Sequence, residues 1–366
     1  MINIQPKIFR YYIPLKNDLI LKGQAASFRE GLILAFCEND KILALGEIAP
    51  LPGFSRETIE QAEEQTVRSI KNMPLDLVLP GLLDSPLIET MIEHAIESKL
   101  YPSVEFGLCT ATLNLISHIK KVPVRKLLSE NAADQININA LLSGSVEEIT
   151  EKTKQLIANG YSTFKLKVGR QNLDEDIELV RKVNYLIKDS GVLTLDANRA
   201  WSVDDALKFG KSINDIKVAY IEEPVKDYLG ILQLSNNGKF KIPIALDESL
   251  AAIIPKAMEI IPGVTTLVLK PTIIGFVKTI AFNKQAKNLG MKTVISSSFE
   301  SSIGLNALAE FASGFDASAG LDTIAWFAED TLASSFEIKF GQVNLNEILE
   351  QKLNMESSHI QEISLV

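Results

Sequence analysis

The sequence contains very few of the side chains that soft metal sites and disulfide frameworks require. Its 366 residues include two cysteines, Cys37 and Cys109, and three histidines. Neither cysteine belongs to a Cys-x-x-Cys pair and the histidines show no ligand spacing, so we expect neither a zinc site nor a disulfide framework. Two isolated thiols are typical of core packing in a reducing compartment.

Basic runs and long apolar segments are also absent. The 46 acidic residues outnumber the 37 lysines and arginines, which gives a net charge of −9 and predicts no nucleic-acid or anionic-membrane partner. The most apolar stretch, residues 264–282, is interrupted by Lys270, Pro271, Gly275 and Lys278, so it is not a membrane span. The first ten residues contain no signal-peptide core. We therefore expect a cytoplasmic protein, while its oligomeric state stays open.

What the sequence does contain is an alternation of short apolar runs and amphipathic helical segments from about residue 137. The expected strands are Ile138–Leu142, Thr163–Val168, Val192–Leu195, Val218–Ile221, Ile242–Leu246, Thr266–Leu269, Thr293–Ile295 and a weak eighth near Ala317–Leu321. Helical patterns between them include Val146–Ala158, Leu173–Lys188 and Val203–Ser212. Such repetition predicts an α/β fold with a buried parallel sheet, closed into a (β/α)8-type barrel. The alternative, a doubly wound sheet, would require a glycine-rich phosphate loop, and the sequence has none.

The segments on either side of the barrel pattern differ from it. Apolar runs at residues 31–36 and 42–48 predict an antiparallel hairpin. Helices are expected at Thr58–Ile70 with Ser55 as its cap, at Pro86–Ser98, and from Ser103 to Ile119. Beyond the barrel we expect a strand at Phe336–Phe340, a helix at Leu345–Leu353 and a tail at Ile360–Val366. We predict an α+β capping domain in residues 1–102, the barrel in 103–330, and a segment, 331–366, that returns to the capping domain.

Charged side chains follow five successive expected strands. Lys165 and Lys167 lie on the second, and the later strands end in Asp196-Ala197-Asn198, Glu222-Glu223, Asp247-Glu248 and Lys270. Each acidic residue taken alone would serve equally well as a helix cap. Their recurrence once per strand is more specific, because the carboxyl ends of barrel strands converge on one mouth, where barrel active sites lie.

This set of charges suits proton abstraction next to a carboxylate. Asp196, Glu222 and Asp247 offer oxygen ligands to a hard cation, Mg²⁺ first, with Mn²⁺ as a possible substitute. Lys165 and Lys167 are two residues apart and so share a strand face, while Lys270 lies across the mouth. We expect neighbouring cations to depress the pKa of the basic lysine. Glu223 should point away from the metal ligands. The expected partner is a small-molecule carboxylate.

The ordered set resembles the muconate-lactonising branch of the enolase superfamily over nearly the whole chain. Gly46–Thr58 is similar to the capping-domain loop of the o-succinylbenzoate synthase family, and Ser296–Leu305 and Gly320–Thr323 are similar to its seventh- and eighth-strand segments. The resemblance implies that Ser297 and Gly320 lie near the substrate's succinyl carboxylate, where hydroxyl and backbone N–H donors fit an anion. It also places Asn198, Ser298 and Phe54 in the substrate site.

The resemblance implies dehydration of 2-succinyl-6-hydroxy-2,4-cyclohexadiene-1-carboxylate to o-succinylbenzoate, a step in menaquinone biosynthesis, through a Mg²⁺-stabilised enediolate. Lys167 would remove the α-proton and then protonate the departing hydroxyl, Lys165 would lower the pKa of Lys167, and Lys270 would be a cation over the opposite face. An N-acylamino acid racemase, with both lysines as bases, stays open. A dipeptide epimerase is disfavoured because Asp322 stands alone after the eighth strand, and a non-catalytic scaffold because no catalytic charge is missing.

Overall fold

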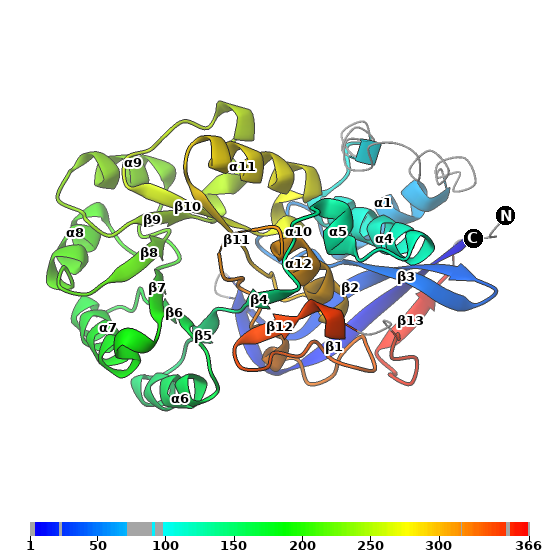
Figure 1. Cartoon of the computed structure of the whole chain (residues 1–366), viewed down its shortest axis with the longest axis horizontal. Helices are drawn as coiled ribbons and strands as arrows, with labels where there is room; N and C mark the ends of the chain where they lie inside the picture. Colours follow the sequence, from blue (N-terminus) through cyan, green and yellow to red (C-terminus); the bar gives the residue numbers. More distant parts are fainter. Residues whose placement is uncertain are drawn as a thin grey trace.

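The computed structural model of the chain describes residues 4–21, 24–71, 90–91, 98–315, 317–348 and 352–364. Figure 1 shows two lobes side by side, one built on a curled parallel sheet with helices outside it and one on an antiparallel sheet. The blue N-terminal strands and the red C-terminal strand lie in the same lobe, so the chain ends where it began.

The antiparallel sheet has the strand order β13-β1-β2-β3 in the described part of the chain. Its members are β1 (Gln5–Leu21), β2 (Gln24–Glu38), β3 (Lys41–Ile48) and β13 (Ile360–Ile363). The expected hairpin is confirmed as β2–β3, and its two turn residues, Asn39 and Asp40, both have positive φ, as a two-residue hairpin turn requires. Strand β13 pairs with β1, which brings the end of the chain against the N-terminal strand.

Helices α1 (Ile59–Lys71) and α4 (Pro102–Lys120) accompany this sheet. A side chain at Gly46 would place its Cβ 2.2 Å from the carbonyl oxygen of Gly107, so β3 and α4 approach closely only because both residues are glycine. The expected cap at Ser55 is wrong: the Thr58 hydroxyl accepts the Gln61 N–H at the start of α1, whereas the Ser55 hydroxyl accepts the Leu51 N–H within the loop. The helix expected at Pro86–Ser98 lies mostly outside the described residues.

The parallel sheet follows chain order from β5 to β11 without a reversal, and the described residues give it seven strands. They are β5 (Ala140–Leu142), β6 (Thr163–Lys167), β7 (Val192–Asp196), β8 (Val218–Glu222), β9 (Ile244–Leu246), β10 (Val264–Leu269) and β11 (Lys292–Ile295). Bridges from Ala319 to Ile138 and from Gly320 to Ser296 join the two edges, so the weak eighth strand is two residues that close the barrel. A doubly wound sheet would reverse its strand order at a switch point, and this sheet does not.

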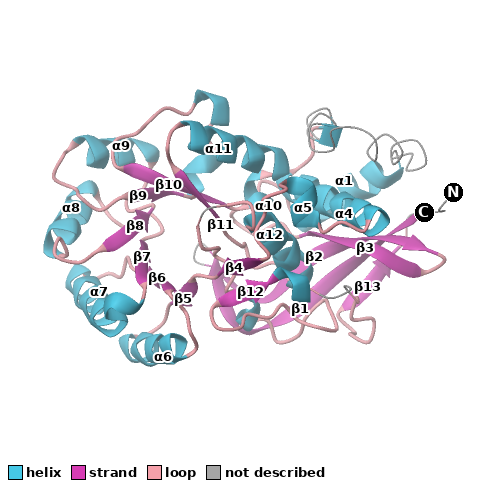
Figure 2. Ribbon diagram, viewed as in Figure 1, coloured by secondary structure: helices cyan, strands magenta, loops and turns pink. Residues whose placement is uncertain are grey.

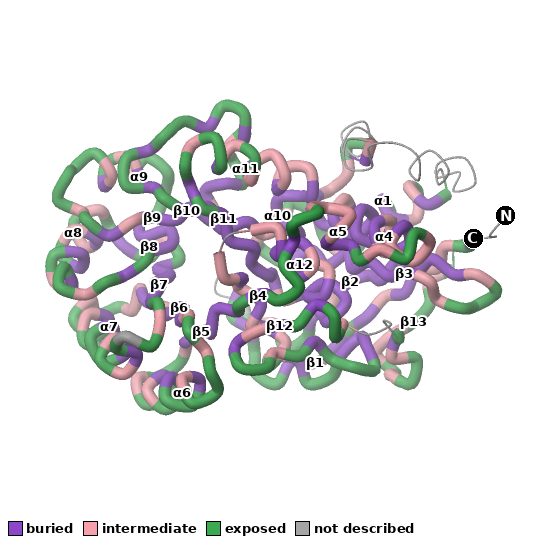
Figure 3. Tube along the Cα trace, in the orientation of Figure 1, coloured by how far each residue is buried: buried purple, intermediate pink, exposed green. Residues whose placement is uncertain are grey.

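Helices lie outside the parallel strands (Figure 2). They include α5 (Val124–Leu128), α6 (Val146–Ala158), α7 (Leu173–Ile187), α8 (Val203–Ser212), α9 (Tyr228–Asn236), α10 (Pro271–Ile274), α11 (Phe276–Asn288) and α12 (Ser302–Ala312). Ser145 and Glu148 form a reciprocal capping box at the start of α6, and Ser202 caps α8. Figure 3 shows the strands buried and the outer faces of these helices exposed, which is the amphipathic pattern read from the sequence.

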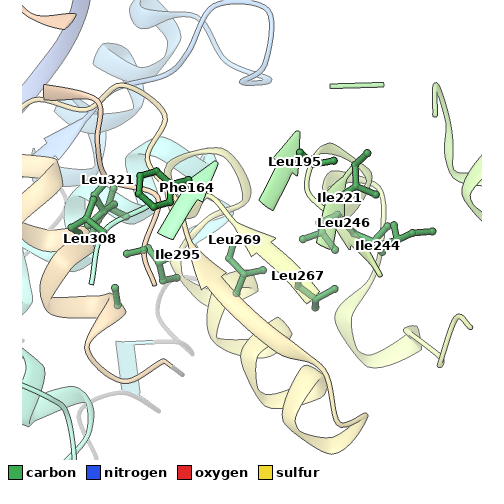
Figure 4. Packing of buried hydrophobic residues seen from close by; sticks show 14 of the residues in the cluster. Phe164, Leu195, Ile221, Ile244, Leu246, Leu267, Leu269, Ile295, Leu308 and Leu321 are labelled. Carbon is green, nitrogen blue, oxygen red and sulfur yellow. The ribbon is translucent and has the colours of Figure 1, made fainter. Parts of the chain in front are cut away.

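Side chains alternate along each barrel strand between the helices and the barrel interior. Phe164, Leu195, Ile221 and Leu269 belong to the large apolar cluster between strands and helices (Figure 4). The side chains that alternate with these point into the barrel, where they form a small interior cluster of Tyr220, Ala245, Val268 and Val294. Burial of each large aliphatic side chain contributes about 1.5–3 kcal/mol. Because Lys165 and Lys167 have the interior parity, the same alternation directs them into the barrel.

The segment after the barrel differs from expectation. No strand forms at Phe336–Phe340; instead β12 (Gln342–Asn344) pairs with β4 (Gln135–Asn137). Of the helix expected at Leu345–Leu353, Leu345–Glu347 forms a single 3-10 turn, and residues 349–351 lie outside the described part of the chain. Phe336 is buried against the barrel core, which explains the apolar content of residues 336–340 although they form no strand. The boundaries at 102/103 and 330/331 remain a prediction. No described helix has the length and apolar character needed to cross a membrane.

Candidate active site

Three of the predicted residues are direct neighbours across the carboxyl ends of three strands. Lys167 of β6 is opposite Asp196 of β7, and Asp196 is opposite Glu222 of β8. Ala245 of β9 is opposite Glu222, so Asp247, two residues further on, continues the row with the same parity. Strand register alone therefore places one lysine and three carboxylates side by side at the mouth of the barrel.

The lysine ammonium groups bind the carboxylates directly. Lys165 Nζ lies 3.0 Å from Asp196 Oδ2 and 2.6 Å from Glu222 Oε2. Lys167 Nζ lies 2.7 Å from Asp196 Oδ2 and 2.5 Å from Asn198 Oδ1. The Lys165 side chain is 10% exposed and the Lys167 side chain is 35% exposed, so Lys167 is the lysine of the pair that faces the open mouth.

Across the mouth, Lys270 follows β10 and donates a short hydrogen bond to Asp247. The Lys270 side chain is 21% exposed. The next residue, Pro271, is the first residue of α10. Lys167 and Lys270 thus approach the row of carboxylates from its two ends, each paired with a different carboxylate.

Carboxylates dominate the electrostatics around Lys165 and Lys270. Burial disfavours the charged form of Lys270, but Asp247 and Glu248 outweigh it and raise the pKa of Lys270. Burial is likewise outweighed for Lys165 by Asp196, Glu222 and Asp247, which raise its pKa well above the usual value. Lys165 and Lys270 are therefore held as cations by the carboxylates around them, as their expected electrostatic roles require.

The carboxylates respond in opposite directions. Burial opposes ionisation of Asp196, yet Lys165 and Lys167 hold the pKa of Asp196 well below its usual range. Burial raises the pKa of Glu222, and repulsion from Asp196 and Asp247 adds to this effect against the attraction of Lys165. Burial, reinforced by two neighbouring carboxylates, is therefore what opposes the ionisation of Glu222.

The donor set fits a hard divalent cation. Its three carboxylates come from neighbouring strands and are at most 6% exposed, and oxygen ligands of this kind are those that Mg²⁺ prefers. Among the residues that the structure describes, however, no three acidic, histidine or cysteine side chains form a ready cluster, and ammonium groups hold the oxygens that a cation would need.

Glu223 points away from the mouth, as its strand parity predicts. It accepts hydrogen bonds from the backbone N–H groups of Asp247 and Ser249 and from the guanidinium of Arg199. Its φ of +39° is unusual for a residue other than glycine, and these buried bonds hold the chain in that conformation. Glu223 therefore holds the backbone at Asp247 and Ser249 in place.

Glu248 is a residue of the mouth that the sequence-based site did not include. Asn198 Nδ2 donates to Glu248 Oε1 at 3.2 Å, and Glu248 Oε2 is buried with no hydrogen-bond partner among the described residues. Burial, with repulsion from Asp247, raises the pKa of Glu248. The only sequence signal was its position directly after Asp247, which gave no reason to expect both side chains near the mouth.

The predicted substrate residues after the seventh and eighth strands lie together. Ser297 Oγ contacts the Gly320 carbonyl oxygen at 3.1 Å and Thr323 Oγ1 at 2.9 Å, and Ser298 Oγ is buried with no partner in the described part of the chain. The backbone N–H groups of Ser297 and Gly320 already donate to Gly320 and Ile295 carbonyls in the barrel ladder. They are therefore not free to bind a carboxylate, which corrects that part of the expectation and leaves the two hydroxyls as donors.

Phe54 lies in the loop between β3 and α1 and packs against an apolar cluster of the antiparallel sheet. The same cluster receives Ile273 of α10 and Phe299, which follow the sixth and seventh strands of the barrel. The capping loop and the two barrel segments that carry Lys270 and Ser298 thus pack against the same apolar cluster.

The chain is similar to known proteins over most of its length. Residues 148–348 match the family model described as "Enolase C-terminal domain-like", and residues 4–76 match "MenC, N-terminal domain". The o-succinylbenzoate synthase of Vibrio cholerae serotype O1 is 36% identical over 83% of this chain and 84% of its own length. That of Pasteurella multocida is 33% identical over 84% of each.

Solved structures show the same fold. MenC from Desulfotalea psychrophila has a TM-score of 0.77 at 20% identity and covers 93% of this chain and 99% of its own. The L-Ala-D/L-Glu epimerase from Bacillus subtilis has a TM-score of 0.77 at 17% identity, covering 96% and 97%. The fold is therefore shared by enzymes with different activities, and the sequence relatives decide the family. The chain belongs to the o-succinylbenzoate synthase family of the enolase superfamily.

Proposed function

We propose that the residues of the barrel mouth dehydrate 2-succinyl-6-hydroxy-2,4-cyclohexadiene-1-carboxylate to o-succinylbenzoate, a step in menaquinone biosynthesis. One observation carries the chemistry: Lys167, Asp196 and Glu222 are opposite one another in strand register, with Lys270 beyond them. The names of the relatives support this substrate over others that the same chemistry could use. We also propose that the reaction takes place in the cytoplasm, as expected from a sequence with neither a signal-peptide core in its first ten residues nor a long apolar run.

Lys167 is the proposed acid and base. Its side chain is the most exposed of the three lysines, so a substrate entering the mouth meets it first. Neutral Lys167 takes the proton next to the carboxylate, and the electron pair of the broken C–H bond moves onto that carboxylate to give an enediolate. From there the pair returns to form the new C=C bond of the ring. The C–O bond then breaks, Lys167 returns the proton to the departing hydroxyl, and one molecule of water leaves as the ring becomes aromatic.

Lys165 and Lys270 are proposed to act as cations. Lys165 is nearly buried and fixed by Asp196 and Glu222, so it supplies positive charge without exchanging protons with the substrate. The raised pKa of Lys270 keeps it protonated, which suits a stationary charge over the opposite face of a planar, anionic intermediate. The proton transfers therefore fall to a single face of the substrate.

Asp196, Glu222 and Asp247 are proposed to hold Mg²⁺, which Mn²⁺ could replace. When bound, the cation would polarise the substrate carboxylate and make its neighbouring C–H bond more acidic. To reach it, the three carboxylates must exchange contacts with Lys165 and Lys270 for contacts with the metal. We expect Asn198, which already contacts Lys167, to orient that lysine.

Ser297 and Ser298 are proposed to bind the second, succinyl carboxylate. Ser298 Oγ is a buried donor with no partner among the described residues, and such groups are rare unless a ligand completes them. Gly320 lies beside these serines: its carbonyl oxygen contacts Ser297 Oγ, and a Cβ at this position would come within 2.7 Å of Ser296 Oγ. Phe54 is proposed to cover the substrate from the capping loop.

The direct test is to incubate the purified protein with the cyclohexadiene substrate and follow formation of the aromatic product, with Mg²⁺ and after exhaustive chelation. We expect product formation that chelation abolishes and Mg²⁺ restores. Absence of product, or full activity in chelator, would contradict the proposal. The presence of lysines at both ends of the site also makes N-acylamino acid racemisation a second candidate, and racemisation far faster than dehydration in the same preparation would favour it.

A further inference from the structure

The chain makes an unfavourable turn directly after Ser297 and Ser298. Phe299 has a φ of +61°, in the left-handed region that bulky side chains seldom adopt. Such a conformation persists only where surrounding contacts hold it. The contacts at this turn come mainly from the capping lobe, whose sequence is more than 240 residues away.

Arg29 of β2 supplies one set of these contacts. Its guanidinium is only 3% exposed and donates to five backbone carbonyls. Nε donates to Phe299 at 2.8 Å and Nη2 reaches Ser298 at 3.5 Å. Nη2 also donates to Ala49 at 2.5 Å, while Nη1 donates to Pro50 at 2.9 Å and to Glu30 at 2.7 Å. Arg29 therefore joins the base of the capping loop to the turn beside Ser297 and Ser298, whose hydroxyls are the proposed donors to the substrate.

Glu47 of β3 holds the other side of the turn. Its carboxylate accepts the backbone N–H groups of Ser301 and Gly304 at 2.9 and 2.7 Å, at the start of α12. The hydroxyls of Tyr11 and Ser301 donate to it at 2.5 and 2.7 Å. The Arg29 cation thus binds carbonyl oxygens at the turn, which carry partial negative charge. The Glu47 carboxylate binds N–H groups after the turn, which carry partial positive charge, so each charge is favourable where it lies.

We propose that Arg29 is a positioning residue for substrate binding, which couples the base of the capping loop (residues 49–50) to the turn that carries Ser297 and Ser298. This inference rests on the proposed function in naming what the turn binds. The loop that covers the substrate and the hydroxyls that bind its far carboxylate are then set by one guanidinium. Displacement of either segment would disturb the other.

The bonding of Arg29 differs from that of an arginine with a stabilising role alone. Arg125 is equally buried, at 3% exposure, but it forms ion pairs with Asp134 and Glu310. The five acceptors of Arg29 are all main-chain oxygens from three separate segments, and a planar fork of five donors is the group that can satisfy them together. Arg29 thus defines backbone geometry on both sides of the lobe interface, whereas Arg125 neutralises carboxylates at a distant place.

The first test measures backbone hydrogen exchange in the substrate-free protein, so that it does not depend on activity. Arg29→Met is compared with Arg125→Met, a matched control that also removes a buried guanidinium. We expect Arg29→Met to speed exchange about tenfold in both peptides 49–58 and 296–304 and Arg125→Met to leave both unchanged. Equal exchange of these two peptides in the two variants would overturn the proposal, as would a change in one peptide without the other.

Arg29→Lys serves if the methionine variant does not fold. Lysine has three donors for five acceptors, so both peptides should exchange at intermediate rates. In dehydration assays at saturating Mg²⁺, we expect KM to rise about tenfold in Arg29→Lys and less than twofold in Arg125→Met, because positioning rather than chemistry is lost. An unchanged KM in Arg29→Lys would contradict the proposal. Failure of the wild-type protein to dehydrate the substrate would instead contradict the proposed function and leave the exchange test intact.

Discussion

The lysines and carboxylates of the mouth hold one another in place before any ligand arrives. Lys165 is shared by Asp196 and Glu222, and Lys270 is bound to Asp247. The identity of these residues could be predicted from the sequence, because strand ends of a barrel converge and charges there are few. Their pairing could not be, since it depends on distances of a few ångströms that no sequence spacing gives. For that reason the sequence did not indicate which carboxylate would bind each lysine.

At the same scale, Asp247→Asn tests the proposed metal site. The substitution removes one of the three negative charges of the proposed site, so we expect Mg²⁺ affinity to fall at least tenfold. Stability should change little, because the Asp247 backbone N–H keeps its bond to Glu223. Titration calorimetry with Mg²⁺ measures the affinity, and Asp215→Asn, an exposed partner of Arg181, is the matched control. Mg²⁺ binding as tight as in the control would remove Asp247 from the site.

Among the elements, those buried on both faces were the easiest to predict. Strands β6, β7 and β8 begin where the apolar runs begin and end within one residue of the expected position. Strand β1 was missed because Pro14, Lys16, Asn17 and Asp18 interrupt its alternation, and the register with β2 shifts at that place. The ends of the chain form strands only by pairing with distant segments, as β12 does with β4, and local sequence carries little information about such pairing.

The loop between β3 and α1 is predicted to close over bound substrate. Behind it lies a cavity of about 740 Å³ lined by Arg29, Pro50, Pro52 and Gly53, so the loop is not packed tightly on that side. Limited proteolysis within residues 50–55 should slow severalfold when o-succinylbenzoate is bound, because closure removes the loop from solvent. Cleavage in a loop at residues 237–239 provides the internal control. Equal cleavage with and without product would show that the loop does not close.

Helix α6 allows a test of element stability that is separate from catalysis. Ser145→Ala removes the hydroxyl that accepts the Glu148 N–H, and loss of such a cap costs about 1 kcal/mol. We expect urea denaturation to show this loss with dehydration unchanged. Glu151→Ala, which removes an exposed ion pair on the same helix, should change the free energy of unfolding by about 0.5 kcal/mol or less. Equal effects of the two variants would argue against the capping box.

As a whole, the molecule places the proposed substrate site where its two lobes meet. The capping sheet reaches the barrel through Arg29 and Glu47, and the apolar cluster of that sheet includes Ile303 of α12. The sequence predicted a barrel with a capping lobe, because the helix–strand period changes on both sides of the barrel. It did not predict these contacts, since Arg29 and Glu47 lie in a hairpin with no recognisable motif for binding a turn hundreds of residues away.

Deletion of residues 360–366 tests how the chain's end supports the capping lobe. It removes β13 and leaves β1 paired on one side only. We expect faster hydrogen exchange at residues 8–11 of β1 and unchanged exchange in β6–β8, because the barrel ladder does not include the tail. If β6–β8 also exchanged faster, the two lobes would unfold as one unit and the effect would not be local.

The central claim is that Lys167 performs both proton transfers while Lys270 acts only through its charge. The most direct measurement is the dehydration rate of purified Lys167→Ala and Lys270→Arg, with N-acylamino acid racemisation assayed alongside. Loss of a general acid–base group costs at least about a hundredfold, so Lys167→Ala should lose nearly all dehydration. Lys270→Arg keeps a cation and should retain measurable dehydration while losing any racemisation, which needs a base on each face. Dehydration at a near wild-type rate in Lys167→Ala would contradict the account.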